Sequence, residues 1–447
     1  MLDIKFIREN SELVEKAAKA KNIDINVQEV LDIDKDYREL VSEVQKLRED
    51  RNKYAKAASN AVDKEKIIQE GREIKKQLDE KEKKLKEKEE KLKELLLQIP
   101  NPAKPDVKIG KNDTENDVLR TVGTPKKFDF TPRDHLELGE ILDIIDVQRA
   151  AKVSGTRFAY LKNEAVVLEF ALVQFALETL IKEGFIPVIP PVLIKQSITQ
   201  GLGYWQAGGN EDYYLVYDPR CRRCEKEITI SDKICPRCGN NLEKEEHALY
   251  LVGTAEHSLV PMHKDEIFNG KDLPRRYVGF SSAFRREAGS YGKDTKGILR
   301  VHQFDKVEMV SLVKQGEDDE EHEFLLSLEE KLFKSLGIPY QLVKMCTGDL
   351  GFPAARKYDL EAWLPGQGKY REVTSVSTVT DFQSRRLNIK YKEGTKTEYI
   401  NILNGTAFAI GRTIIAILEN YQQEDGSVLV PDVLQKYTGF SEIKPKK

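Results

Sequence analysis

The stretch that decides the fold begins Phe284-Arg285-Arg286-Glu287 and, after a glycine-rich turn, continues Arg300-Val301-His302-Gln303-Phe304-Asp305-Lys306-Val307-Glu308. It predicts two strands joined by a loop built around Gly289, Gly292 and Gly297. The arginine offers a forked donor that suits phosphate, and the aromatic ring of the returning strand offers a face for a purine. The stretch therefore predicts a nucleotide site.

Two further segments extend this interpretation. The stretch above resembles motif 2 of the class II aminoacyl-tRNA synthetases, in the version found in seryl-tRNA synthetases. Asn404-Gly405-Thr406-Ala407-Phe408-Ala409-Ile410-Gly411-Arg412 resembles motif 3, and Gly184-Phe185-Ile186-Pro187-Val188-Ile189-Pro190-Pro191 resembles motif 1. The resemblance covers nearly the whole chain. It implies a serine–tRNA ligase, which activates serine with ATP to seryl-adenylate and passes the seryl group to the 3′ end of tRNA(Ser).

The 447 residues are more than one hydrophobic core usually serves, so we expect two domains. From about Asp106 onward, short β-rich runs alternate with amphipathic helices without a regular βαβ rhythm, which predicts an α+β domain around an antiparallel sheet. The runs are Leu249–Val252, Val301–Val310, Tyr358–Trp363 and Tyr399–Leu403. The resemblance implies that residues 106–447 form a class II catalytic domain.

The first part of the chain carries two heptad seams, which predict two long helices. Their apolar members are Val30, Ile33, Tyr37, Leu40, Val44, Leu47, Tyr54 and Ala58, then Ile67, Ile74, Leu78, Leu85, Leu92, Leu95 and Ile99. The break over residues 57–63 is short, so the helices should fold back as an antiparallel coiled coil about 40 Å long. Pro100, Pro102 and Pro105 end the second helix, and we assign residues 1–105 to this arm.

The arm has two interpretations. In the first, the arm is a solvated coiled coil that only supports assembly. In the second, which the resemblance implies, the arm grips tRNA(Ser). Glutamates alternate with the lysines on the exposed face of the arm, so the charge pattern fits either interpretation. The chain as a whole balances 72 basic against 75 acidic residues, so any surface that binds nucleic acid must be local. The lysines that could meet phosphates are Lys46, Lys53, Lys56, Lys75, Lys76, Lys83 and Lys84.

The start of the chain lacks the features of a secretory signal. The longest apolar stretch, Ala165 to Ile181, is interrupted by Glu169, Gln174 and Glu178, which favours a core helix over a membrane span. We therefore expect a cytoplasmic protein with no membrane contact.

The resemblance assigns ATP-binding and catalytic roles. It places Arg285 at the α-phosphate and the serine carboxylate, Phe304 on one adenine face, and Arg412 on the other face and at the γ-phosphate. Glu287 is assigned to the adenine edge, while Glu372 and Ser375 are candidates to hold Mg²⁺, which prefers oxygen ligands. The remaining candidates of the ATP site are Arg286, Val301, Val373 and Thr374. Taken singly, an arginine or glutamate on a strand is more often part of a structural ion pair.

The resemblance also implies a serine subsite. Thr254 and Glu256 match positions that meet the α-amino group. Glu308 and Thr406 match positions that meet the hydroxyl, with Asn404 nearby, although Thr406 is also plausible as a simple turn residue. A buried carboxylate left without its hydroxyl partner would penalise alanine.

Three positions depart from the family pattern. His257-Ser258-Leu259 stands where an apolar residue and proline are usual, Arg286 replaces a common serine, and Thr378 replaces a frequent asparagine. The first two put the detailed geometry of the ammonium end of the site in doubt.

Four cysteines form two knuckles, Cys221-Arg222-Arg223-Cys224 and Cys235-Pro236-Arg237-Cys238, separated by ten residues. This spacing favours structural Zn²⁺ over disulfides or free thiols, within an insertion over residues 219–241 that the usual bacterial-type pattern lacks. Four sulfur ligands leave no open position for catalysis. The arginines of the insertion, Arg220, Arg222, Arg223 and Arg237, leave contact with the tRNA acceptor end open as a second role.

The resemblance implies a homodimer, because motif 1 helices form the dimer contact in class II enzymes. Two alternatives remain at this stage. One is a paralogue that loads an amino acid onto a carrier protein, although such relatives lack the long arm. The other is a silent tRNA-binding regulator, against which Arg285, Glu372 and Arg412 argue.

Overall fold

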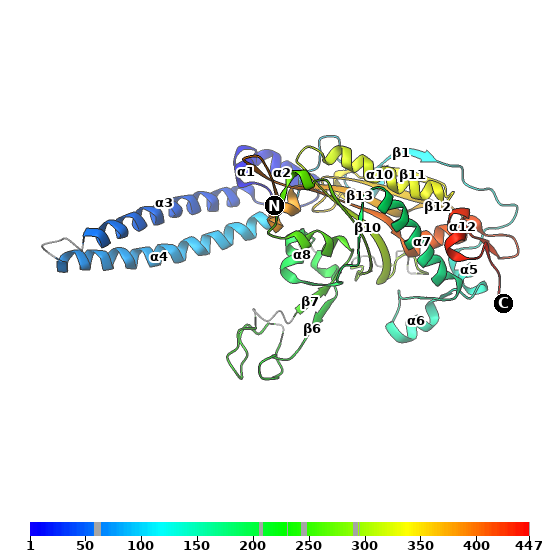
Figure 1. The fold of residues 1–447 in the computed structure, drawn as a ribbon, viewed down its shortest axis with the longest axis horizontal. Coiled ribbons are helices and arrows are strands. Elements are labelled where there is room, and N and C mark those ends of the chain that lie inside the picture. Colours follow the sequence, from blue (N-terminus) through cyan, green and yellow to red (C-terminus); the bar gives the residue numbers. More distant parts are fainter. Residues whose placement is uncertain are drawn as a thin grey trace. The chain divides into compact units, whose positions relative to one another are not determined.

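The computed structural model describes residues 1–57, 64–204, 209–229, 231–242, 248–288, 294 and 296–446, and the chain divides into two compact units, Met1–Pro102 and Ala103–Lys447 (Figure 1). Two predicted features lie outside the described residues. They are the break between the arm helices over residues 58–63, and Gly289 and Gly292 of the motif 2 loop.

The first unit is helical. Its two long helices lie side by side and antiparallel (Figure 1), and the buried side chains between them include Val30, Val44 and Leu78 of the predicted seams. Lys81 and Lys88, which interrupt the second seam, form ion pairs across the helices, with Nζ 2.6 Å from Glu43 and 2.6 Å from Asp36. The helices are α1 (Ile4–Glu9), α2 (Ser11–Ala20), α3 (Val27–Ala57) and α4 (Lys64–Leu97).

An eight-stranded sheet organises the second unit, in the order β1-β11-β12-β13-β16-β10-β9-β4. All neighbours pair antiparallel except β4 and β9, which confirms the predicted α+β class with an antiparallel sheet. The strands are β1 (Asp117–Val122), β4 (Ile186–Val188), β9 (Arg275–Phe284), β10 (Gln303–Val313), β11 (Tyr340–Lys344), β12 (Arg356–Leu364), β13 (Lys369–Thr380) and β16 (Asn401–Ala409).

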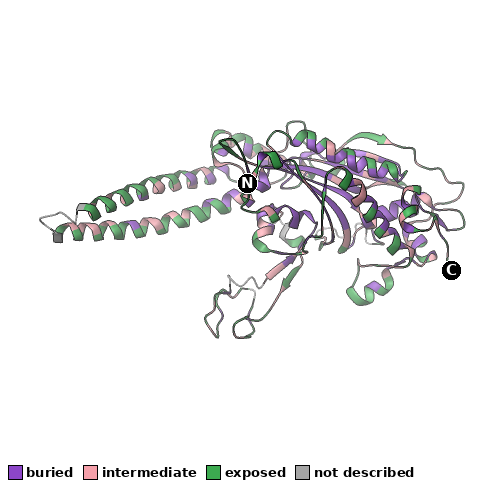
Figure 2. Cartoon of the chain, viewed as in Figure 1, coloured by how far each residue is buried: buried purple, intermediate pink, exposed green. Residues whose placement is uncertain are grey.

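Three helices cover one face of this sheet and enclose the main hydrophobic core, as the buried residues in Figure 2 show. They are α7 (Glu164–Lys182), α10 (Asp318–Ser335) and α12 (Ile410–Tyr421). Strand residues therefore alternate between the core and the opposite face. On β10, Val307 and Met309 lie in the core, so Lys306 and Glu308 lie on the other face.

Smaller elements complete the second unit on both sides of the sheet. The three-stranded sheet β5-β7-β6 carries the cysteine insertion between β6 and β7. The strands are β2 (Ile145–Asp146), β3 (Tyr160–Leu161), β5 (Leu193–Lys195), β6 (Leu215–Tyr217), β7 (Ala248–Leu251), β8 (Ile267–Asn269), β14 (Lys390–Glu393), β15 (Lys396–Tyr399), β17 (Val428–Leu429) and β18 (Glu442–Ile443). The helices are α5 (His135–Ile141), α6 (Val147–Ser154), α8 (Gln196–Leu202), α9 (Glu256–Leu259), α11 (Phe382–Leu387) and α13 (Asp432–Thr438). Of these, α13 packs against α7, and α5 packs against α12, on the core side. None of the helices in the described part of the chain is long and apolar enough to span a membrane.

Candidate active site

Arg285 follows directly on β9 and is held from two sides. Its main-chain N–H donates to the carbonyl oxygen of His302 at 3.0 Å, and its Nε donates to the carbonyl oxygen of Gly253 at 3.2 Å. The guanidinium carbon lies 5.4 Å from the ring centroid of Phe304, which β10 places opposite Ala283. One predicted phosphate ligand and one predicted adenine platform are therefore neighbours.

The residues that follow Arg285 turn away from the strand. The main-chain N–H of Arg286 donates to the carbonyl oxygen of Asp212 at 2.9 Å, and its side chain is exposed. Glu287 adopts a left-handed backbone conformation with φ 53°, and its carboxylate pairs with Arg300. Val301 is buried in the core, so its side chain supports the site from behind.

Arg412 and Glu372 lie together on the open side of the sheet. Nη1 of Arg412, in the first turn of α12, lies 3.1 Å from Oε2 of Glu372, while its Nε donates to the carbonyl oxygen of Leu299 at 3.2 Å. Burial opposes ionisation of Glu372, but the charges of Arg412, Lys357 and Arg285 outweigh it and lower the pKa of Glu372 to about 2. Glu372 is therefore an anion at neutral pH.

A β-bulge brings the two candidate metal ligands to the same face. The register between β12 and β13 shifts between Leu360 and Glu361, so Glu372 lies opposite Glu361 and Ser375 lies opposite Asp359. Without the bulge, residues three apart on a strand would point to opposite faces. Burial, opposed by the charge of Lys357, raises the pKa of Asp359 to about 7.

Val373 and Thr374 differ from their neighbours on β13. Val373 belongs to the core, and Thr374, which is 2% exposed, lies opposite Leu360 on the core side of the sheet. The structure thus places these two side chains away from Glu372 and Ser375.

The predicted ammonium ligand, Glu256, is 2% exposed at the start of α9, with the buried Thr254 two residues before it. Tyr204 donates to both carboxylate oxygens at 3.1 and 3.0 Å, and Gln383 Nε2 donates to Oε1 at 2.8 Å. Burial, opposed by the Gln383 hydrogen bond and reinforced by the charge of Glu308, raises the pKa of Glu256 to about 7.

The predicted hydroxyl ligands meet between β10 and β16. Thr406 Oγ1 donates to Glu308 Oε2 at 3.1 Å, and Nζ of Lys306 lies 2.5 Å from the same oxygen. Asn404 is 8% exposed, and its Nδ2 has no hydrogen-bond partner among the described residues. The structure therefore brings together Glu308, Thr406 and a lysine that had no assigned role.

Five residues of the site carry no sequence assignment: Tyr204, Lys306, Lys357, Asp359 and Gln383. Three of them had a usable signal in the sequence, because Lys306 and Glu308 are two apart on a strand and therefore share a face, as do Lys357 and Asp359. Tyr204 and Gln383 follow or lie in helices remote in sequence from Glu256, and only the tertiary fold joins them.

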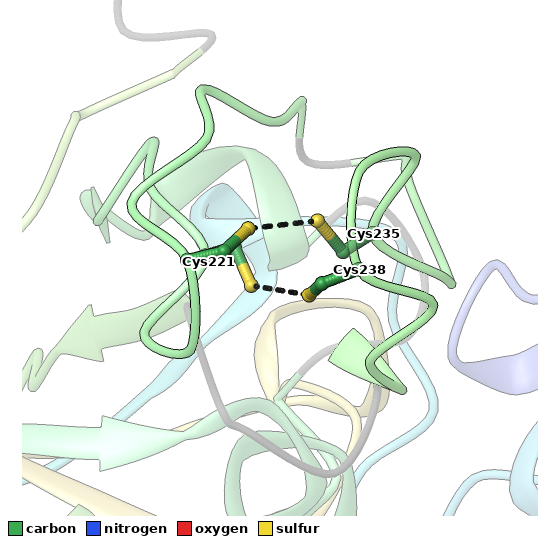
Figure 3. Close-up of side chains that lie close together, drawn as sticks. Cys221, Cys235 and Cys238 are labelled. Atoms are coloured by element: carbon green, nitrogen blue, oxygen red, sulfur yellow. Dashed lines mark hydrogen bonds between the residues drawn. The ribbon is translucent and has the colours of Figure 1, made fainter.

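The four cysteines of the insertion converge, with all four sulfur atoms within 4.8 Å of one another; Figure 3 labels Cys221, Cys235 and Cys238 of this cluster. The distance from Cys221 Sγ to Cys238 Sγ is 3.7 Å, and that from Cys224 Sγ to Cys235 Sγ is 3.6 Å. Ligands about 2.3 Å from a tetrahedral Zn²⁺ would be about 3.8 Å apart, so the sulfur positions fit that ion. Cys346 lies elsewhere, buried with its Sγ 3.2 Å from the carbonyl oxygen of Asn112.

Comparison with known proteins covers both units. Residues 1–103 match the family model described as the seryl-tRNA synthetase N-terminal domain, and residues 240–421 match the tRNA synthetase class II core domain (G, H, P, S and T). The chain is 42% identical to the serine–tRNA ligase of Dictyoglomus turgidum over 453 residues, covering 100% of both chains.

Solved structures of seryl-tRNA synthetases are also similar to this chain over its whole length. The seryl-tRNA synthetase of Pyrococcus horikoshii complexed with ATP superposes with a TM-score of 0.86 at 41% identity, covering 100% of both chains. The cytoplasmic serine–tRNA ligase of Naegleria fowleri in complex with AMP gives 0.84 at 30% identity, covering 100% of this chain and 99% of that one.

Proposed function

This chain belongs to the seryl-tRNA synthetase family, and on that premise we propose that the site around Arg285 performs the ATP-dependent ligation of serine to tRNA. A carboxylate oxygen of serine attacks the α-phosphorus of ATP and pyrophosphate leaves. The terminal ribose hydroxyl of tRNA(Ser) then attacks the carbonyl carbon of seryl-adenylate, losing its proton, and AMP leaves. Both steps demand positioning and charge stabilisation rather than a protein nucleophile.

One observation carries this assignment. Arg412 contacts the ionised carboxylate of Glu372, the charge of Arg285 acts on the same carboxylate, and Arg285 lies beside the ring of Phe304. Two reacting anions need cations on both sides, and a purine needs an aromatic platform. We assign Arg285 to the α-phosphate and the serine carboxylate, Arg412 to the γ-phosphate, and Phe304 to the adenine.

We assign Glu372 and Ser375 to Mg²⁺. The fit rests on an ionised carboxylate and a hydroxyl on one face of β13, both of them oxygen donors. When bound, Mg²⁺ neutralises phosphate charge. The protein's own part is to keep Glu372 ionised, through Arg412 and Lys357.

Serine is assigned to the two buried carboxylates, Glu256 and Glu308. Glu256 would receive the ammonium group, and Glu308 with Thr406 would receive the hydroxyl, because both carboxylates are buried and oriented by hydrogen bonds or ion pairs. Alanine would leave Glu308 without that partner.

The experiment is to measure serine-dependent ATP–pyrophosphate exchange and charging of total tRNA in one preparation. We expect both activities, with serine the preferred amino acid and tRNA(Ser) the charged product. Exchange without charging would favour a carrier-protein ligase, and neither activity would favour a silent regulator.

We further propose that residues 1–105 bind tRNA, that residues 106–447 catalyse, and that the insertion over residues 219–241 is a zinc ribbon. The antiparallel α3 and α4 support a tRNA-gripping coiled coil, and the sulfur distances support Zn²⁺ in a stapling role. Because charging serves protein synthesis, we place the enzyme in the cytoplasm.

We also propose a homodimer. Large apolar side chains are exposed on α7 and along the motif 1 segment after it, where Phe170 is 59% exposed and Ile189 is 87% exposed. A second copy would cover them, as exposed apolar groups that cluster favour association. Sedimentation should give twice the chain mass, and Phe170→Asp should shift the protein towards monomer, whereas the same change at the exposed Val118 of β1 should not.

A further inference from the structure

His257 occupies a position where the sequence departs from the family pattern, and it is 5% exposed directly after Glu256. Its imidazole packs between two tyrosine rings, with centroids 4.7 Å from Tyr204 and 5.5 Å from Tyr213. The ring is therefore fixed by packing beside the site rather than being free to reorient.

A single hydrogen bond defines the protonation state of this ring. The main-chain N–H of Gly253 donates to Nδ1 of His257 at 3.2 Å. A main-chain N–H can only donate, so Nδ1 must be unprotonated and the ring proton belongs on Nε2. The hydroxyl of Tyr213, 3.3 Å from the same nitrogen, is the second polar group there. Burial and the charges of Arg285 and Lys306 act in the same direction and hold the pKa of His257 well below its usual value.

The peptide group that His257 contacts is held at both ends. Its N–H, from Gly253, donates to His257, and its carbonyl oxygen, from Val252, accepts from the main-chain N–H of Phe284 at 2.8 Å. The peptide plane between Val252 and Gly253 therefore cannot rotate without losing one of these bonds.

The next carbonyl along the chain is the one that holds Arg285. The oxygen of Gly253 accepts from Nε of Arg285 at 3.2 Å, which leaves the two terminal nitrogens of the guanidinium for other acceptors. A Cβ added to Gly253 would lie 3.3 Å from Cε1 of His257 and 3.7 Å from Cγ of Arg285. Imidazole and arginine thus both pack against the same glycine.

We propose that His257 is a positioning residue for serine activation: its Nδ1 fixes Gly253, whose carbonyl oxygen fixes the guanidinium of Arg285 towards the α-phosphate and the serine carboxylate. The proposal rests on the function proposed above, since it acts through Arg285. A neutral ring also supplies this acceptor without adding a third cation beside Arg285 and Lys306.

The matched variants are His257→Asn and His257→Leu in the full-length protein. The two replacement side chains have the same branching, but only asparagine offers an oxygen acceptor near the position of Nδ1. We expect the leucine variant to lose about 10- to 100-fold in kcat of serine-dependent exchange, with KM for serine changed less than about threefold, because misplacing a group that acts in the transition state lowers kcat. The asparagine variant should retain kcat within about fivefold of the wild type.

Equal kcat values in the two variants, high or low, would overturn the proposal, because the acceptor would then not matter. A raised KM with unchanged kcat would also overturn it, since His257 would then act on Glu256 instead. Should His257→Leu unfold, His257→Phe keeps an aromatic ring between the two tyrosines but offers no acceptor to Gly253, and wild-type kcat in that variant would refute the proposal. Failure of the proposed function would differ: the wild type itself would show no serine-dependent exchange.

Discussion

Nη1 of Arg412 makes two contacts with Glu372: it donates to the main-chain carbonyl oxygen at 3.1 Å, and it lies 3.1 Å from the carboxylate oxygen Oε2. The arginine comes from the first turn of α12, and the glutamate comes from β13. The two elements therefore meet at the candidate metal ligand, and the low pKa of Glu372 keeps it charged across the pH range in which enzymes of this class would work.

Glu372→Gln preserves the shape and the carbonyl contact of residue 372 but removes the charge. We expect exchange to fall about 100-fold or more, with a higher Mg²⁺ concentration needed for half-maximal rate, because the lost anion is the strongest metal ligand proposed. The rate of exchange measured against Mg²⁺ concentration checks this. Glu361→Gln is the matched control, as Glu361 lies opposite Glu372 but accepts from Gln341 at 2.6 Å. Equal losses in both variants would contradict the metal assignment.

The buried pair of Lys306 and Glu308 predicts a large effect on stability. The two residues are 6% and 2% exposed, so Lys306→Met would leave a buried carboxylate without its cation. We expect the free energy of unfolding to drop by about 3–5 kcal/mol. Denaturant unfolding measures it. The double variant Lys306→Met with Glu308→Gln should regain most of the loss, and an unchanged loss would show that packing rather than charge is responsible.

Glu256 predicts how serine binding depends on pH. Burial raises its pKa to about 7, so the carboxylate is protonated below that pH and cannot pair with an ammonium group. KM for serine should therefore rise as pH falls from 8 to 6, approaching tenfold per unit well below the pKa. Steady-state exchange across this range measures the effect, and a KM that did not change would refute the assignment of Glu256.

The raised pKa of Glu256 also predicts that the folded state loses stability as pH rises, whereas serine binding improves. Between the ordinary glutamate pKa of about 4.3 and about 7, the folded state holds a proton that the unfolded state has lost. The contribution of Glu256 to stability is therefore greatest at low pH and is lost as pH rises through about 7. Thermal unfolding of Glu256→Gln should show a higher Tm than the wild type at pH 8, with the gap closing towards pH 5.

Order and spacing in the sequence predicted the antiparallel sheet and the clustering of the cysteines, because motifs and knuckles are local patterns. All four predicted strand runs overlap observed strands, although Tyr399–Leu403 is divided between the end of β15 (Lys396–Tyr399) and the start of β16 (Asn401–Ala409). Buried Val30, Val44 and Leu78 likewise follow from heptad positions.

Long-range geometry was not accessible in this way. The bulge that brings Glu372 and Ser375 to one face depends on how β12 pairs with β13, and no local signal marks it. Gln383 reaches Glu256 from 127 positions away, so its role follows only from the fold. His257 looked like an unexplained departure because its partner is a main-chain N–H, which carries no side-chain signature.

Metal removal tests the zinc ribbon. The protein purified without chelators should contain one Zn²⁺ per chain. Stripping the metal should expose the insertion over residues 219–241 to proteases before serine-dependent exchange declines, because four sulfur ligands leave no catalytic position. Cys235→Ser should lose the metal, whereas Cys346→Ser, whose thiol lies near Asn112, should keep it. Immediate loss of exchange on chelation would show that the metal has another role.

The arm predicts a separation between activation and charging. Deleting residues 30–99 should leave serine-dependent exchange within about threefold of the wild type while abolishing tRNA charging.

A finer change is to replace the exposed Lys75, Lys76, Lys83 and Lys84 of α4 by glutamine. Lys81 and Lys88 are kept, because they hold the two helices together. We expect KM for tRNA to rise about 10-fold or more, and the salt dependence of charging to weaken, since each phosphate contact releases counterions. Glu73, Glu80 and Glu87 replaced by glutamine form the control on the same helix and should not weaken charging. If the lysine variant charged tRNA as well as the wild type, these four lysines would not be the contact surface. If the truncated protein did so, the arm would serve assembly alone.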